Sequence, residues 1–441
     1  MALPRVLILN QPFVSDTGGG ITLSNLFAGW DTDKLAVACS GYIMTPDIDP
    51  KVCNNYYQLG GEERKWVFPF NLLSRKYLSG QVKFTDRSKD NVVAEASKSK
   101  TRVGFIMKYF NPFLEYSGLV HFITKTSLSA QFRKWLDDYN PDVVYAQCSS
   151  RESILFCIAV NKYLNKPSVF HMMDDWPSLI GVKGFMSTYW KNKIDKEFRI
   201  LLDDTHVHLG ISDYMAQEYK NRYGKEFIPF HNPIDLKFWQ SGQKKNYKLS
   251  ENPTILYAGR IGLGIDNSLM TIAEAIKTVN TELQLTIKFA IQAQASPAWI
   301  KEYEFVKHRE FVPYEELPHE FGSADFLILP YDFSPSSIAY IKYSMPTKAS
   351  EYMASGTPIL IYAPEYTALV QYAKRNHWAT IVENENVRVL ADEIRKLVTD
   401  QQFRQSLAET AKKQAEERHD SQVVTLEFQK IIANATKIQR Q

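Results

Sequence analysis

The 441-residue sequence has little cysteine and no long apolar run. Its four cysteines, at positions 39, 53, 148 and 157, form no C-x-x-C pair. Isolated thiols in apolar or mixed surroundings are typical of buried cysteines in a reducing compartment, and they argue against a disulfide framework or a zinc site. No stretch of about eighteen apolar residues occurs, so we expect no membrane-spanning helix. The apolar run Val6–Leu9 is too short for a signal peptide.

The chain also lacks a strong charge of either sign. Its 52 Lys and Arg residues nearly balance 49 Asp and Glu residues, which leaves a formal charge of +3. This value is too small to favour a nucleic-acid partner. Hydrophobic residues make up 44 % of the chain and charged residues 23 %, as in ordinary globular proteins. The length exceeds what one hydrophobic core supports, so we expect two domains.

The most informative stretch is 344–362, SMPTKASEYMASGTPILIY. Pro346 suits the start of a helix, and Gly356 followed by a proline is a stop signal. The apolar run Ile359–Tyr362 predicts a buried strand. Lys348 and Glu351 are three residues apart, so both project from the same side of the predicted helix.

The loop before this helix is long. Residues 325–330, DFLILP, predict a buried strand, and the loop 331–345 that follows exceeds the usual two to six residues. Ligands of open α/β sheets lie beyond the carboxyl ends of the strands, where a helix N-terminus suits a phosphate. One cation and one carboxylate would fit a diphosphate and two ribose hydroxyls. The alternative is a surface Lys–Glu pair on an ordinary amphipathic helix.

Residues 309–331, followed by the pattern P-x-K-x-x-E-Y-M-A-x-G-x-P-I-L, resemble the donor-binding half of glycosyltransferase family four, in its polysaccharide-biosynthesis branch. The resemblance implies the α/β GT-B fold, in which two Rossmann-like domains face each other across a cleft. The family pattern has two glutamates eight residues apart. Glu351 matches the second glutamate, with an implied role at the nucleotide ribose, and Tyr343 stands in place of the first. Because Tyr343 replaces this glutamate, the sequence does not indicate which residue binds the sugar hydroxyls.

The resemblance also gives domain boundaries. We expect an acceptor-side domain over 1–240, a polar linker over 241–253, and a nucleotide-sugar-binding domain over 241–419. In the GT-B fold the last helix returns to the first domain, and residues 420–441 contain an apolar stripe that suits this return.

Two further donor-binding residues follow from the resemblance. Arg260 matches the family arginine on the donor diphosphate, and a guanidinium suits a phosphate chemically. The lysine that family members carry a few residues later is absent from 262–267, so Lys348 is expected to supply the second positive charge. Val312 is also assigned to the donor site.

A glycine-rich segment opens the first domain. The strand predicted over 5–10 leads to Gly18, Gly19 and Gly20, just before a helical pattern that starts at Ile21. The pattern is not G-x-G-x-x-G, so a dinucleotide site is unsupported. In the family a loop here faces the donor, which assigns Gly19 and Gly20 to donor binding. The alternative is a flexible turn without a ligand.

Three polar residues follow the strand predicted from Ser168. His171 resembles a family histidine near the donor sugar, and we assign it to catalysis with Arg260 and Lys348. Asp174 and Asp175 are candidates for orienting an acceptor hydroxyl. Two D-x-D triplets, at 31–33 and 47–49, lie in turn-like settings and are interpreted as solvated turns. We therefore expect no metal site and no cofactor beyond the donor.

Residues 64–134 differ from the rest of the chain. They contain fourteen Lys and Arg residues against four Asp and Glu residues, with aromatic residues between them. This composition suggests an anionic interface such as lipid headgroups. The alternative is a solvated charged face over a Phe-rich core.

Together these observations predict a glycosyltransferase that acts with retention and without metal. It would move a sugar from a nucleoside diphosphate sugar, with UDP-glucose as the first guess, to a glycan or lipid-linked acceptor. The expected location is the cytoplasm, peripherally on the membrane. Two alternatives remain, a nucleotide-sugar 2-epimerase of the same fold and a non-catalytic nucleotide-sugar-binding subunit.

Overall fold

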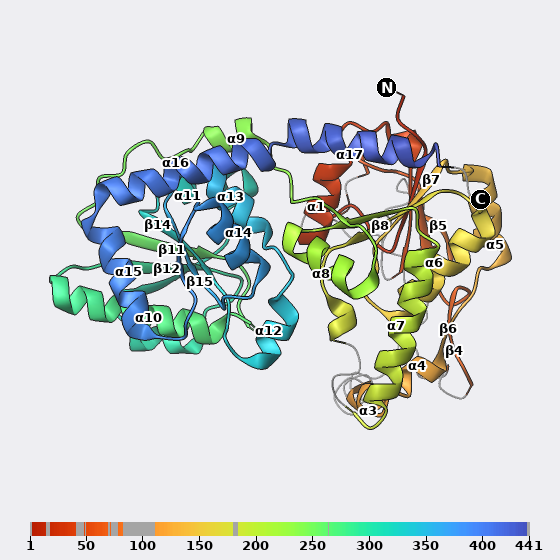
Figure 1. The fold of residues 1–441 in the computed structure, drawn as a ribbon, viewed down its shortest axis with the longest axis horizontal. Helices are drawn as coiled ribbons and strands as arrows, with labels where there is room; N and C mark the ends of the chain where they lie inside the picture. Colours follow the sequence, from red (N-terminus) through yellow and green to blue (C-terminus); the bar gives the residue numbers. More distant parts are fainter. Residues whose placement is uncertain are drawn as a thin grey trace. The chain divides into compact units, whose positions relative to one another are not determined.

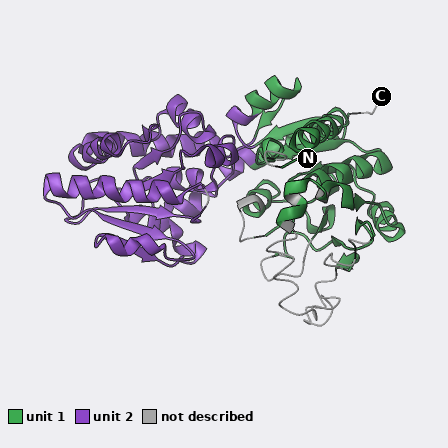
Figure 2. Cartoon of the chain, turned by 90° about the horizontal axis from the view of Figure 1, so that it is seen from below, with its two compact units in different colours: residues 1–210, 216–229, 425–441 green, residues 211–215, 230–424 purple. Residues whose placement is uncertain are grey.

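A computed structural model describes residues 2–14, 18–40, 48, 50–68, 71, 78–82, 111–179, 184–262 and 264–438. The chain forms two compact units (Figure 2). Unit 1 comprises residues 1–210, 216–229 and 425–441, and unit 2 comprises residues 211–215 and 230–424. The chain therefore passes four times from one unit to the other.

The large sheet of unit 1 has the order β10-β9-β8-β7-β1-β2-β3-β5, and all neighbours are parallel except β3 and β5. Its strands are β1 (Val6–Leu9), β2 (Leu35–Ser40), β3 (Tyr56–Leu59), β5 (Gly80–Val82), β7 (Val143–Ala146), β8 (Ser168–Met172), β9 (Val207–Gly210) and β10 (Ile228–Pro229). A separate antiparallel pair joins β4 (Arg64–Trp66) to β6 (Thr124–Thr126). The central strands are apolar throughout because both faces of a parallel sheet are covered.

The helices of this part of the chain are α1 (Gly18–Leu26), α3 (Asn111–Ser117), α4 (Val120–Ile123), α5 (Ala130–Tyr139), α6 (Arg151–Leu164), α7 (Ser187–Asp203), α8 (Asp213–Tyr223) and α17 (Ser421–Ala435). Local signals define several of their ends. Ser150 and Ser153 form a capping box at the start of α6, and Asn165 ends that helix in the left-handed conformation.

The sheet of unit 2 is fully parallel, with the order β13-β12-β11-β14-β15-β16. Its strands are β11 (Thr254–Ala258), β12 (Lys288–Gln292), β13 (Val306–Arg309), β14 (Phe326–Pro330), β15 (Ile359–Tyr362) and β16 (Thr380–Val382). The order is that of a Rossmann sheet, in which the first three strands are added towards one side and the next three towards the other. The point where the order reverses lies between the first and fourth strands. Here the reversal lies between β11 and β14, and in unit 1 the equivalent point lies between β1 and β7.

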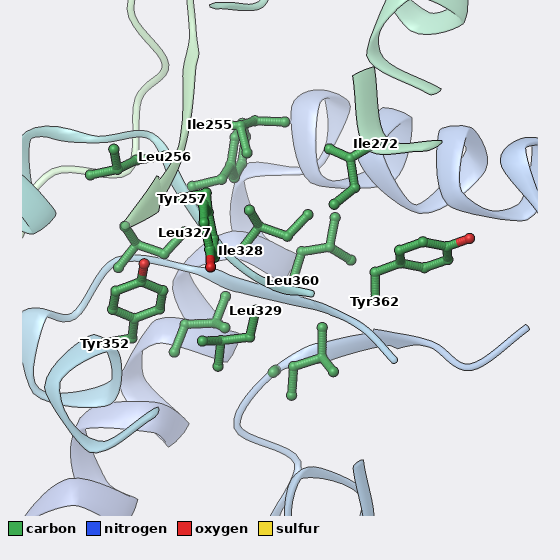
Figure 3. Packing of buried hydrophobic residues seen from close by; sticks show 14 of the residues in the cluster. Ile255, Leu256, Tyr257, Ile272, Leu327, Ile328, Leu329, Tyr352, Leu360 and Tyr362 are labelled. Carbon is green, nitrogen blue, oxygen red and sulfur yellow. The ribbon is translucent and has the colours of Figure 1, made fainter. Parts of the chain in front are cut away.

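The helices of unit 2 are α9 (Leu236–Gln240), α10 (Asp266–Leu283), α11 (Leu317–Ser323), α12 (Pro335–Ile341), α13 (Thr347–Ser355), α14 (Ala368–Asn376), α15 (Val387–Thr399) and α16 (Gln401–Arg418). The strands and helices share one apolar core, part of which is drawn in Figure 3. Leu327, Ile328 and Leu360 lie in the middle of this view, with Tyr352 and Tyr362 on opposite sides.

The last helix returns to unit 1, as the predicted fold class requires. Figure 1 shows α17 running beside α1. Phe428 is fully buried, and its ring centroid lies 5.0 Å from that of Phe27 and 6.0 Å from that of Tyr145. The hydroxyl of Thr425 donates a hydrogen bond to the backbone oxygen of Asn25. The α/β fold with two Rossmann-like sheets and a returning C-terminal helix is thus confirmed.

Two local expectations differ from the structure. The helix expected from Ile21 begins at Gly18, so the glycines form its first turn, where backbone N–H groups need no partner within the helix. The segment 241–253, expected to link the domains, lies inside unit 2. Its polar groups bond to unit 2, since Lys244 Nζ donates to the backbone oxygen of Ala324 and Gln243 Nε2 to that of Ala354.

Within the described residues, no helix is both long and apolar enough to cross a membrane.

Candidate functional site

The reversal point of the unit 2 sheet is marked by an exposed arginine. Arg260 follows β11, and its guanidinium lies over the ring of Tyr340 at 5.3 Å. The turn after it uses Gly262 and Gly264 with φ of 118° and 89°, a backbone conformation that side chains other than glycine rarely adopt. The backbone N–H of Gly262 donates to the carboxylate of Asp266 at the start of α10. This turn therefore presents the cation at the carboxyl edge of the sheet.

Helix α13 brings a second cation and a carboxylate to the same edge. Lys348 Nζ lies 2.9 Å from Glu351 Oε2, as the spacing of three residues predicts, and Glu351 is only 3 % exposed. The hydroxyl of Tyr352 accepts a hydrogen bond from the backbone N–H of Ala258, the last residue of β11. This bond fixes the helix against the strand that leads to Arg260. Burying an unpaired carboxylate would strongly destabilise the fold, and here the ion pair with Lys348 offsets that cost.

The long loop 331–345 contains a helix that the sequence analysis did not predict. Ser334 caps α12 by accepting a hydrogen bond from the backbone N–H of Ser337, and Tyr340 on this helix reaches Arg260. The clue was available, because Ser followed by Pro335 is a typical helix start.

Tyr343, which stands where the family has a glutamate, is 6 % exposed. Its ring stacks on Tyr214 with centroids 5.5 Å apart, and Lys342 Nζ lies 4.9 Å from its centroid. Aromatic packing thus occupies a position where the family pattern has a charge.

The loop after β13 carries Val312, which is half-buried and packs against the unit 2 core. Two residues later, the ring of Tyr314 stacks on Phe238 at 4.9 Å. Burial first, and then the charge of Glu351, raises the pKa of Tyr314 to about 12. This loop follows β13 and α13 follows β14, so in the parallel sheet both begin from the same edge.

The other predicted residues belong to unit 1. Gly19 and Gly20 lie in the first turn of α1, after β1. At the reversal point of this sheet, Asn10 adopts φ of 71°, and its side-chain amide donates to the backbone oxygen of Gln147, just beyond β7. The glycines and the end of β7 thus lie at the carboxyl edge where ligands of such sheets bind.

His171 is fully buried near the end of β8. Its Nδ1 lies 2.7 Å from the hydroxyl of Tyr145, and that hydroxyl accepts a hydrogen bond from Gln147 Nε2. The tyrosine hydroxyl has two ways to bond the neutral ring: its O–H donates to Nδ1 when the ring proton is on Nε2, and its oxygen accepts from Nδ1 when the proton is there. Burial lowers the pKa of His171 to about 3. The Nε2 atom has no hydrogen-bond partner within the described structure.

Asp174 is exposed, whereas Asp175 is engaged within unit 1. Asp175 Oδ1 accepts from the hydroxyl of Tyr219 at 2.6 Å and from Arg222 Nη1 at 2.9 Å, and Oδ2 accepts from Ser178 Oγ at 2.6 Å. These contacts anchor the loop after β8 to α8. A role for either aspartate towards an acceptor stays a prediction.

The predicted residues therefore form two groups. Unit 2 holds Arg260, Val312, Tyr343, Lys348 and Glu351, and unit 1 holds Gly19, Gly20, His171, Asp174 and Asp175. The sequence did not single out three residues that position members of the two groups, namely Tyr145, Gln147 and Tyr340. Tyr145 and Gln147 alternate in the apolar segment 141–147, PDVVYAQ, which was a usable signal because alternate residues of a strand share a face.

No cluster of three or more His, Cys, Asp or Glu residues that could hold a metal occurs among the residues that the structure describes. Of the two D-x-D triplets, Asp31 pairs with Lys34, and Asp47 and Asp49 lie outside the described residues. In the basic segment 64–134, Lys98, Lys100, Arg102 and Lys108 also lie outside them, whereas Phe113 on α3 is 57 % exposed.

Comparison with known proteins agrees with this fold. The family model described as "Glycosyl transferases group 1" matches residues 241–414. A search of curated proteins gave no match.

Several solved structures are similar over the whole chain. HepE from Anabaena, in complex with UDP and glucose, has a TM-score of 0.59 at 13 % identity, with 98 % of this chain and 100 % of that one covered. Sucrose-phosphate synthase from Thermosynechococcus elongatus gives 0.60 at 11 %, covering 98 % of each chain. A glycosyltransferase from Rickettsia africae gives 0.61 at 11 %, covering 98 % and 99 %. The chain thus has a GT-B fold over its whole length, and its residues 241–414 match the model of the glycosyl transferases group 1 family.

Proposed function

We propose that this protein transfers a sugar from a nucleoside diphosphate sugar to a glycan or lipid-linked glycan. The observation that carries the proposal is the Lys348–Glu351 pair on α13, which the bond between Tyr352 and Ala258 ties to the strand ending before Arg260. A buried carboxylate and two cations at the reversal point of a Rossmann sheet suit a ribose and a diphosphate.

The proposed chemistry rests on charge stabilisation. As the bond to the sugar breaks, negative charge develops on the leaving diphosphate, and Arg260 and Lys348 would stabilise it. Glu351 would accept hydrogen bonds from the two ribose hydroxyls, while Val312 lines the donor site. We propose a UDP-hexose such as UDP-glucose as donor, because the similar HepE structure contains UDP and glucose.

Unit 1 would supply the remaining groups. Gly19 and Gly20 would approach the donor with their backbone, and His171 would donate from Nε2 to an oxygen of the sugar. Asp174 and Asp175 are the proposed acceptor-side residues. Retention of the anomeric configuration and independence from metal, which the family resemblance implies, are part of the same proposal.

The experiment is a ligand-detected NMR screen of nucleotide sugars against the wild-type protein and Glu351→Gln. Charge-assisted hydrogen bonds contribute about 1.5–3 kcal/mol, so the affinity of the bound donor should fall roughly ten- to a hundredfold in the variant. Glu409→Gln, on the exposed side of α16, is the matched control and should bind normally. Unchanged donor binding in Glu351→Gln would contradict the assignment of Glu351 to the ribose hydroxyls.

A second candidate, a non-catalytic nucleotide-sugar-binding subunit, is favoured by one observation. Tyr343 stands where the family has a carboxylate and is packed against Tyr214. Incubation of the donor with a panel of glycans separates the candidates, since a binding subunit gives no product with any of them. Donor alone tests the 2-epimerase, which would interconvert two nucleotide sugars.

We also propose that the segment 64–134 docks the protein on an anionic cytoplasmic membrane surface beside a lipid-linked acceptor. Its fourteen basic residues against four acidic ones give a local excess that the whole chain does not have. Each Lys or Arg near such a surface contributes about 1 kcal/mol, with a Debye length of about 8 Å at physiological salt. Exposed aromatic residues such as Phe113 would add apolar contacts.

Vesicle co-sedimentation tests the docking. Binding should require anionic lipid, weaken with salt, and fall when Lys98, Lys100, Arg102 and Lys108 are replaced together. Equal binding to neutral vesicles, or none to anionic ones, would favour a soluble acceptor.

A further inference from the structure

Gln292, the last residue of β12, combines complete burial with an unused amide. The side chain is 0 % exposed, and neither its Nε2 nor its Oε1 has a hydrogen-bond partner. Among the side chains that the structure describes, no other has two buried polar atoms left without a partner. A buried amide without partners destabilises the folded state, so a ligand or another group is needed to explain it.

The backbone around Gln292 gives no reason for a polar side chain. The oxygen of Gln292 accepts a hydrogen bond from the N–H of Gly259 at 3.0 Å, and the N–H of Ala293 donates to the oxygen of Arg309 at 3.1 Å. These bonds form with any residue at position 292. The preceding residues of the strand, Phe289, Ala290 and Ile291, are apolar and buried, so an apolar residue would also suit this position.

The register places Gln292 at the nucleotide edge of the unit 2 sheet. Its partner on β11 is Ala258, two residues before Arg260, and its partner on β13 is Arg309, three residues before Val312. Residues in register on parallel strands project to the same face of the sheet. The loop after β13, at the same edge, carries Phe311, which is 51 % exposed.

We propose that the amide of Gln292 hydrogen-bonds the edge of the donor's nucleobase, an inference that rests on the proposed function. An amide presents one donor and one acceptor side by side, and so does the edge of every nucleobase. With uracil, the base N–H would donate to Oε1 and a ring carbonyl would accept from Nε2. A diphosphate offers acceptors only and would leave Oε1 unmet, and the ribose hydroxyls have Glu351 as their acceptor.

The test compares Gln292→Leu with the wild-type protein by titration calorimetry. The ligands are UDP, CDP, ADP and GDP, together with ribose 5-diphosphate, which has no base. We expect the affinity for the preferred nucleotide to fall ten- to a hundredfold and that for ribose 5-diphosphate to stay within twofold. The melting temperature without ligand should not fall, because Leu removes the unpaired amide. Gln292→Met serves if the leucine variant does not fold.

Gln414→Leu is the matched control, since Gln414 is also a buried glutamine of unit 2 and donates to Tyr372 on another part of the unit. It should bind every ligand as the wild type does. Equal losses for nucleotide and ribose 5-diphosphate would overturn the contact with the base, and so would unchanged nucleotide binding in Gln292→Leu. If the wild-type protein binds none of the nucleotides, the proposed function itself fails, which is a different result.

Discussion

We expect Tyr145 to hold the ring of His171 in one tautomer. In that tautomer the O–H of Tyr145 donates to Nδ1, 2.7 Å away, and the ring proton lies on the buried Nε2. Tyr145→Phe removes that donor and frees the ring to exchange tautomers. Because a neutral hydrogen bond contributes about 0.5–1.5 kcal/mol, kcat/KM should fall roughly two- to tenfold. Nitrogen NMR of the imidazole measures the tautomer directly.

The matched comparison replaces His171 itself. His171→Gln carries its amide near the Nε2 position and should retain more activity than His171→Asn, whose amide lies near Nδ1. If the two variants have equal activity, Nε2 does not donate to the substrate, and the histidine serves only the packing of β8.

His419 makes the stability of unit 2 depend on pH. Its Nε2 lies 2.9 Å from the hydroxyl of Tyr372, and Nδ1 lies 3.2 Å from the backbone oxygen of Asn232. Burial, followed by the charges of His231 and Arg418, lowers the pKa of His419 to about 3 against the opposing effect of Asp213. The folded state therefore keeps the ring neutral at pH values where the unfolded chain binds a proton.

The sign follows from this difference. The contribution of His419 is complete above the unfolded pKa of about 6.5 and is lost as the pH falls towards 3, by about 1.4 kcal/mol per pH unit. Urea unfolding of the wild type and His419→Gln at pH 7, 6, 5 and 4 measures it. The free energy of unfolding should fall less steeply in the variant, because other groups titrate in both proteins. Parallel curves would contradict the prediction.

Among the elements, the loop 331–345 contains one of the two departures from the family pattern, Tyr343 in place of a glutamate. Tyr343→Glu restores the family residue beside Lys342, whose ammonium lies over the tyrosine ring. If the loop faces the donor sugar, the variant should change the preference between nucleotide sugars more than the affinity for the nucleotide. Competition assays with several UDP-sugars and with UDP measure both quantities.

Tyr343→Phe is the control, because it keeps the stacking on Tyr214. It should retain the wild-type sugar preference. If Tyr343→Glu folds and changes neither quantity, position 343 does not face the sugar and the alignment of this loop with the family is wrong.

The elements that the sequence predicted best are those with strong local signals. Helix α13 and strand β15 have the predicted bounds. Pro346 and Gly356 determine the two ends of the helix, and the strand Ile359–Tyr362 is buried because all four of its side chains are apolar or aromatic. Helix α12 was missed because a seven-residue helix in a loop has too few apolar positions to show a period. The polar composition of 241–253 wrongly suggested a linker. Its side chains donate hydrogen bonds to backbone carbonyl groups of unit 2.

The candidate site was predictable only where residues are close in sequence. The pair Lys348 and Glu351 follows from helical spacing. The approach of Tyr340 to Arg260 spans many residues, and no local rule foretells it. Gln292 could not be singled out, because a glutamine at the end of an apolar strand is unremarkable until its burial and missing partners are known.

For the molecule as a whole, α17 is the element that completes unit 1. Phe428 packs among Phe27, Trp30 and Tyr145. A buried Phe→Ala substitution lowers the free energy of unfolding by about 3–5 kcal/mol. We therefore expect Phe428→Ala to make unit 1 unfold more often and to leave the stability of unit 2 unchanged. Hydrogen exchange resolves the two units, and the amides of β1 and β7 should exchange faster while those of β11 and β14 stay protected.

Leu426→Ala is the control on the same helix, since Leu426 is 56 % exposed. It should change the free energy of unfolding by no more than about 0.5 kcal/mol. Faster exchange in both units of Phe428→Ala would mean that the units unfold together.

The four passages of the chain between units have a consequence for biosynthesis. A ribosome makes most of the strands of unit 1 before unit 2, yet residues 425–441, which also belong to unit 1, emerge after all of unit 2. Unit 2 ends at Val424, so its residues have all left the exit tunnel before those of the last segment of unit 1. Unit 1 must therefore wait, with the site for Phe428 unfilled, until unit 2 has been made. The unit whose synthesis begins earlier is thus the one completed later.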